Sequence, residues 1–147
     1  MAFSVSTGLR NHMLAIGSFK LAMDLGYLRL YEGTVPASAE AAVSPTNLLC
    51  QITVDAGATR ITWETPAVNG IISKAAAETW QGVNSKDGTA TFFRIVQPAD
   101  TDGAVPAELR VQGLVGLVGA ELNLSSVLLS LGATQTINHF NVALPTL

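Results

Sequence analysis

The first part of the chain has the hydrophobic pattern of a helix. Residues 6–24 contain no proline, and their apolar side chains recur at the spacing of a helical stripe. That stripe comprises Leu9, Met13, Ile16 and Met23, with Phe19 beside it. Ser6 or Thr7 is placed to cap the start of this helix, and Gly26 to end it just after Leu25.

A second apolar stripe lies on the opposite side of the same predicted helix. It is made of Leu14, Leu21 and Leu25. A surface helix of a globular protein normally has one apolar face, so the second face requires another partner. We favour a contact with a neighbouring subunit, although a helix buried on all sides or an extended arm would produce the same pattern.

From Tyr27 onward the pattern changes to short alternating runs separated by turn residues. Strands are predicted at residues 27–31, 49–54, 60–64, 70–73, 89–96, 109–112, 120–124 and 136–144. Residues 127–131 fit either a strand or a helix. About eight short strands predict a mainly β fold, an antiparallel β-sandwich or jelly-roll-like domain. The sandwich domain would span residues 27–147, preceded by a helix or arm at residues 1–26.

Two segments without strand patterning are predicted to be surface loops, residues 33–45 and residues 98–106. The first is rich in alanine and holds Pro36 and Pro45, which leaves room for no more than a short turn of helix. Loops of a small β domain often carry its contacts. Together with the second helical stripe, the first loop supplies the candidate interface residues, which are Leu14, Leu21, Leu25, Val35, Pro36, Ala37, Ala41 and Val43.

Charge is scarce along the whole chain. Eight basic and 11 acidic residues make up 13% of it, against about 25% in an ordinary domain, while the mean hydropathy is +0.37. The longest uncharged segment, residues 122–147, contains too many polar residues to span a membrane. Surface covered by protein neighbours explains the missing charge. The net charge of −3 and the scattered cations argue against nucleic acid as the main partner.

The sequence offers little chemistry. His12 and His139 are the two histidines, and they accompany no recognisable nucleophile and carboxylate pattern. They and Cys50 have no spacing suited to zinc, and Asp100-Thr101-Asp102-Gly103 lacks the remaining ligands of a calcium loop. We therefore expect no enzymatic activity, no cofactor and no metal.

Other residues have structural interpretations. The glycines at 113, 116 and 119 lack the order of a nucleotide-binding loop. Cys50 is interpreted as a buried residue of a chain that folds in a reducing compartment, and no secretory signal precedes it. Trp63 alternates with Ile61 and is assigned to the core, whereas Trp80 is left open between the core and a binding surface.

Several short motifs in a fixed order resemble a group of small structural proteins encoded by tailed bacteriophages. They are YEGTVPA at 31–37, WQG at 80–82, GTATFFR at 88–94, GLVG at 113–116, GAEL at 119–122 and FNV at 140–142. The resemblance covers about residues 27–145 and includes no catalytic signature. It implies a β-sandwich or jelly-roll-like fold and a structural role in the virion.

Size and character match a capsid decoration, or cement, protein best. Such a protein would be assembled in the host bacterial cytoplasm and would sit on the capsid exterior. There it would bridge and stabilise subunits of the major capsid protein and contact copies of itself as a dimer or trimer. A neck, collar or tail protein is the nearest alternative. A carbohydrate-binding β-sandwich module is a second alternative, which would make a carbohydrate its partner; a membrane is not expected as one.

Overall fold

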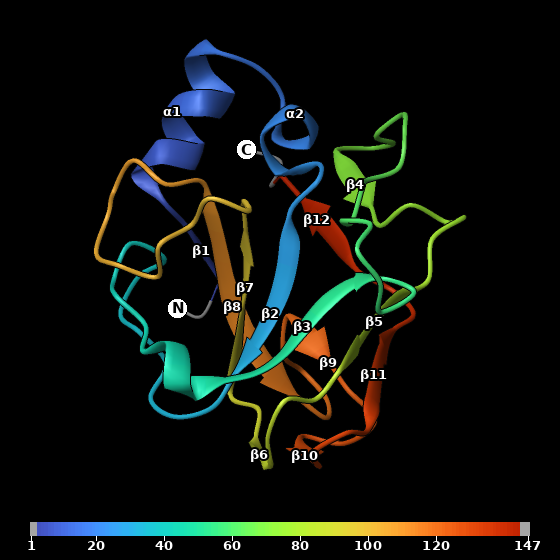
Figure 1. Ribbon diagram of the computed structural model, residues 1–147. Coiled ribbons are helices and arrows are strands. Elements are labelled where there is room, and N and C mark those ends of the chain that lie inside the picture. The colour runs from blue at the N-terminus through green and yellow to red at the C-terminus, as the bar shows by residue number, and fades with distance from the viewer. Residues whose placement is uncertain (1–2, 145–147) are drawn as a thin grey trace.

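The computed structural model describes residues 3–144, and in them a curved antiparallel sheet encloses most of the core (Figure 1). The helices are α1 (Thr7–Ala15) and α2 (Phe19–Met23), and a 3₁₀ turn covers Pro45–Asn47. The strands are β1 (Ser4–Val5), β2 (Tyr27–Tyr31), β3 (Leu48–Val54), β4 (Ile71–Ser73), β5 (Trp80–Val83), β6 (Gly88–Thr89), β7 (Phe92–Val96), β8 (Arg110–Gly116), β9 (Leu122–Asn123), β10 (Leu128–Leu129), β11 (Thr134–Ile137) and β12 (Asn141–Ala143).

The main sheet has the strand order β1-β8-β7-β2-β3-β5-β11. All of these neighbours pair antiparallel, whereas β9 pairs with β8 in parallel. Two further pairs, β12 with β4 and β10 with β6, complete the fold. The protein is therefore mainly β and sandwich-like, as the alternating runs predicted.

Several predicted boundaries were wrong. Residues 60–64 make only isolated bridges, Ile61 to Gly26 and Trp63 to Lys74, and form no strand. The predicted strands at 89–96 and 136–144 are each divided into two, while β1 and β5 were not predicted. The single predicted helix is also divided, because the hydroxyl of Ser18 accepts a hydrogen bond from the Leu21 amide and starts α2 afresh.

The N-terminal segment belongs to the body of the domain. β1 forms one edge of the main sheet by pairing with β8, and Ser6 caps α1 by accepting a hydrogen bond from the Leu9 amide. Leu9 and Met23 are fully buried in the main core. The helices therefore pack on their own sheet, and an extended arm does not describe them.

Aromatic rings fill the middle of the core. Trp63 lies edge-on to Phe19 and Trp80, with ring centroids 5.1 and 5.3 Å apart, and Phe140 packs against both Trp80 and Phe93. Trp63 and Trp80 are 2% and 0% exposed. The core assignment of Trp63 is confirmed, and the open assignment of Trp80 is decided in favour of the core, because its ring has no surface left to present.

The second face of the sheet carries a row of polar side chains. Ser4, Gln112, Arg94, Arg29 and Gln51 pair in register across β1, β8, β7, β2 and β3. Two hydrogen bonds, both 2.9 Å, join Arg94 Nε to Gln112 Oε1 and Arg29 Nε to Gln51 Oε1. The chain segments predicted as loops cover the middle of this polar row, where Arg94 and Gln112 are buried, while Ser4, Arg29 and Gln51 stay half-buried.

Candidate interaction surfaces

The helix end of the molecule exposes apolar side chains on α1, on α2 and just after α2. Leu14 is 85% exposed, Leu21 65% and Leu25 50%. The predicted second stripe thus faces solvent in the isolated chain. One member of the first stripe was misplaced: Ile16 is 73% exposed, because it is the C-cap of α1 and the chain turns away from the core there.

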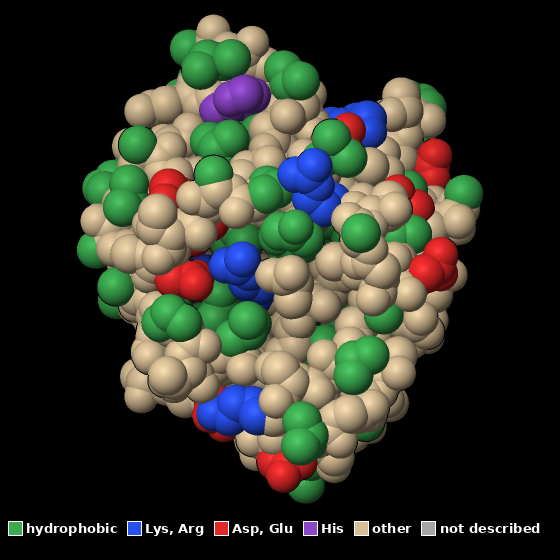
Figure 2. Space-filling view, in the orientation of Figure 1, with side chains coloured by type: hydrophobic (Ala, Val, Ile, Leu, Met, Phe, Trp, Pro, Cys, Tyr) green, Lys and Arg blue, Asp and Glu red, His purple; other side chains and the backbone are tan. Residues whose placement is uncertain are grey.

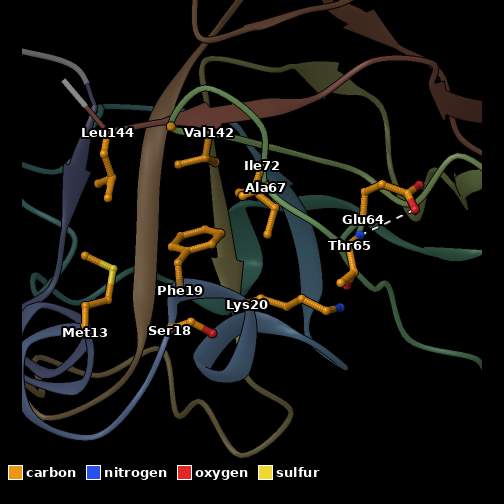
Figure 3. Close-up of a pocket in the computed structure, with 11 residues that line it drawn as sticks. Met13, Ser18, Phe19, Lys20, Glu64, Thr65, Ala67, Ile72, Val142 and Leu144 are labelled. Carbon is orange, nitrogen blue, oxygen red and sulfur yellow. Dashed lines mark hydrogen bonds between the residues drawn. The ribbon is translucent and has the colours of Figure 1, made fainter. Parts of the chain in front are cut away.

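An apolar cavity opens between these helices and the β4–β12 pair. Its volume is about 410 Å³, and Figure 3 shows Met13 and Phe19 on one side of it with Val142 and Leu144 on the other. Ile72 of β4 lines the same space. Most of the wall is hydrocarbon, so the cavity suits an apolar group better than a charged one.

The charged groups at the rim of this cavity are occupied by bonds within the chain. Lys20 Nζ donates to Asp24 Oδ2 at 2.6 Å and to the Trp63 carbonyl at 2.7 Å. Glu64 accepts from the amide of Ala76 at 2.7 Å, and that backbone hydrogen bond is the main cause that lowers its pKa. The exposed hydrocarbon is therefore the main feature that a partner could use here.

The loop at residues 33–45, which we call the strap, lies over the polar row. Among its predicted interface residues, Ala37 is exposed, whereas Val35, Pro36 and Ala41 are half-buried. Val43 is only 7% exposed, because it packs with Tyr31 and Phe92 in a small second core. Its assignment to an interface was wrong.

Buried arginines hold the strap in place. Arg94 Nη2 donates to the carbonyls of Ala41 at 2.8 Å and Ser38 at 3.2 Å, and Gln112 Nε2 donates to that of Pro36 at 2.9 Å. Arg94 is fully buried and has no ion-pair partner among the described residues. Burial, together with the charge of Arg110, lowers its pKa to about 10. The strap is a fixed surface layer.

The second loop segment is held by ion pairs. Arg110, fully buried, binds Asp100 through two hydrogen bonds, of 2.6 Å from Nε and 3.1 Å from Nη2, and also contacts Glu108. Asp102 accepts from Tyr31 Oη at 3.0 Å and lies 3.4 Å from Arg29 Nη1. The two acids that resembled a calcium loop thus bind arginines of the sheet, which explains why they are there.

A second exposed apolar group lies at the opposite end of the molecule, which we call the tip. Its side chains, 51–87% exposed, are Val83, Leu117, Val118, Leu128 and Leu131. Figure 1 places β6 and β10 at this end, away from the helices, and Figure 2 shows apolar side chains at both ends and over the face between them, with charged side chains scattered across the view and also at the lower end. Sequence reasoning missed the tip, although the apolar pair between Gly116 and Gly119 in a turn was a usable signal.

The groups considered for catalysis do not come together. His12 lies on α1, with Nε2 buried and without a hydrogen-bond partner, and His139 lies between β11 and β12. Burial raises the pKa of the Cys50 thiol to about 12, which leaves it protonated and unreactive near neutral pH. Residues 3–144 contain no group of three or more His, Cys, Asp or Glu side chains that could hold a metal ion.

No helix within residues 3–144 is both long and apolar enough to cross a membrane. Comparisons with protein-family models, with curated proteins and with solved structures found no match to this chain.

Proposed function

We propose that this protein is a structural component of a tailed-phage virion, and specifically a capsid decoration protein that bridges neighbouring subunits of the major capsid protein. One observation carries the proposal: large exposed apolar side chains lie at two opposite ends of the β domain, and a bridge needs two separate contact surfaces. The resemblance of the ordered short motifs to phage structural proteins points the same way.

The size of the molecule fits such contacts. A standard interface buries about 800 Å² on each partner, and the isolated chain exposes 7549 Å². Two standard contacts would then cover about a fifth of its surface. Interface cores are depleted in charged residues, which agrees with the 13% charge of this chain. Bridging adds binding free energy to the assembled shell and so resists the pressure of the packaged genome.

The test uses phage particles with and without the protein. Genome release on heating, followed with a DNA-binding dye, should occur at a lower temperature in particles that lack it. Mass spectrometry of separated heads and tails should find the protein in heads. Equal release temperatures, or recovery in the tail fraction, would contradict a decoration role, and the second result would favour the neck, collar or tail alternative.

Variants at each end distinguish bridging, which needs both contact surfaces, from attachment through one surface alone. Leu21→Lys changes the helix end and Val118→Lys changes the tip; Asn11→Lys, exposed on α1, is the matched control. Burying a leucine is worth about 1.5–3 kcal/mol, so each end variant should bind particles about tenfold more weakly or worse. Bridging predicts that both lose the protection against heat while the control keeps it. Full protection by either end variant would refute the bridge.

A further inference from the structure

A second cavity, separate from the apolar one, is lined mainly by uncharged polar side chains. It has a volume of about 490 Å³ and lies between β9 and the segment that joins β11 to β12. Three asparagines line it, Asn123, Asn138 and Asn141, together with the hydroxyls of Ser125 and Thr136. The volume lies within the range of about 300–1,000 Å³ that is usual for small-ligand sites.

The polar groups of this groove are held on a rigid base. Along β9, β11 and β12 the apolar side chains alternate inward, and Leu122, Ile137 and Val142 are at most 8% exposed. The amide of Lys74 donates to the carbonyl of Phe140 at 2.9 Å, which fixes the segment between β11 and β12. The backbone that carries the outward asparagines is therefore fixed before any ligand arrives.

Much of the hydrogen-bonding capacity in the groove is unused within the described chain. The side chains of Asn138, His139 and Asn141 make no hydrogen bond to another residue of 3–144. Asn123 uses only Oδ1, which accepts from the Ala120 amide at 3.1 Å, and Glu121 uses only Oε2, which accepts from the Leu114 amide at 2.9 Å. Donors and acceptors are left facing the same space.

We propose that this groove binds a neutral saccharide. An asparagine amide offers two donors and an acceptor side by side, which matches neighbouring sugar hydroxyls that both donate and accept. The exposed imidazole of His139 supplies a flat ring for the C–H face of a pyranose. Glu121 is the only charged residue in the lining, and no lysine or arginine joins it, so phosphorylated or sulfated ligands fit poorly. Trp80 plays no part, because it is buried.

The test measures binding of the full chain to an array of uncharged oligosaccharides built from hexoses and N-acetylhexosamines. Side-chain amide NMR signals are followed while the best array sugar is added. We expect binding, with shifts at Asn138 and Asn141. Removing one neutral hydrogen bond costs about 0.5–1.5 kcal/mol, so the double variant Asn138→Ala/Asn141→Ala should bind about tenfold or more weakly. Asn11→Ala, at an exposed asparagine on α1, is the matched control and should bind as the unmodified protein does.

Two results would overturn the proposal. One is that no array sugar binds and no asparagine signal moves; the other is that the double variant binds as strongly as the Asn11→Ala control. The two changed residues, Asn138 and Asn141, belong to neither group of exposed apolar side chains, although the β9 side of the groove borders the tip at Leu117 and Val118. The double variant should therefore attach to particles and protect them against heat normally, so each proposal can fail alone.

Discussion

Replacing Arg110 with methionine tests whether the buried ion pair holds the two loop segments on the sheet. The substitution keeps much of the side-chain volume but removes the guanidinium that binds Asp100 at 2.6 and 3.1 Å and the Gly103 carbonyl at 2.8 Å. Asp100, with a side chain 1% exposed, would be left buried without its cation. Removing one partner of a buried ion pair costs about 3–5 kcal/mol. In this pair the contact is bidentate, and the two side chains are 0% and 1% exposed. We expect a loss of stability of that size.

The assay is guanidinium unfolding followed by tryptophan fluorescence, since Trp63 and Trp80 are buried and will report exposure to water. Guanidinium unfolding should give the loss of about 3–5 kcal/mol directly, and thermal unfolding should show the same loss as a fall in Tm of about 6–20 °C for a chain of this size. Arg10→Met is the matched control, because Arg10 is a surface arginine whose ion pair with Glu40 is 3.9 Å long. Such a pair is worth about 0–1 kcal/mol.

The double variant Asp100→Leu/Arg110→Met provides a second test of the ion pair. Because that variant leaves no orphaned Asp100 carboxylate, it should be more stable than Arg110→Met alone. If Arg110→Met unfolds within about 1 kcal/mol of the Arg10→Met control, the ion pair does not hold the loops and the account is wrong.

Two further predictions follow from buried groups. Burial raises the pKa of Cys50 from 9.0 to about 12, so the stability that the protonated thiol contributes is complete below pH 9 and is lost as pH rises towards 12. Between neutral pH and pH 10, the Cys50→Ala variant should therefore lose less stability in urea unfolding than the unmodified protein does. An equal loss in the two proteins would contradict this. Gly82→Ala would place a Cβ 2.3 Å from the Gln51 carbonyl oxygen and should destabilise the protein by about 1–3 kcal/mol in thermal unfolding. The control is Gly57→Ala, whose Cβ would have its nearest contact at 3.4 Å and which should be almost neutral. Similar losses of stability in the two variants would refute the steric explanation.

The sequence predicts an element correctly where the hydrophobic pattern along the chain matches the side chains that the folded domain buries. Residues 27–31 alternate between the main core and the polar row, and β2 occupies those same residues. The helix was found but its division was not, because the apolar stripe continues across Ser18, where a side-chain cap interrupts the backbone pattern. β5 was missed because Trp80-Gln81-Gly82-Val83 is short and its glycine is required by the close approach of Gln51, which no local pattern reveals.

The candidate surfaces were predicted in part, for a related reason. Leu14, Leu21 and Leu25 were recognisable as a second stripe, and the structure leaves them exposed. Val43 was misassigned because its burial depends on Tyr31 and Phe92, which lie on distant strands. The polar groove was not predicted at all, since its asparagines come together only through the pairing of β12 with β4 and the return of β9 to β8.

The way in which the strap is anchored has a consequence for how this surface can change. The arginine and glutamine bonds that hold it end on main-chain oxygens of Pro36, Ser38 and Ala41, and the Ala39 amide is bound by the Ser4 hydroxyl. Every residue type has the carbonyl oxygen, and every type except proline has the amide N–H, so an outward side chain such as that of Ala37 can be exchanged while the anchoring bonds remain. The strap is therefore a natural place for altering specificity by mutation or for displaying a foreign peptide without unfolding its support.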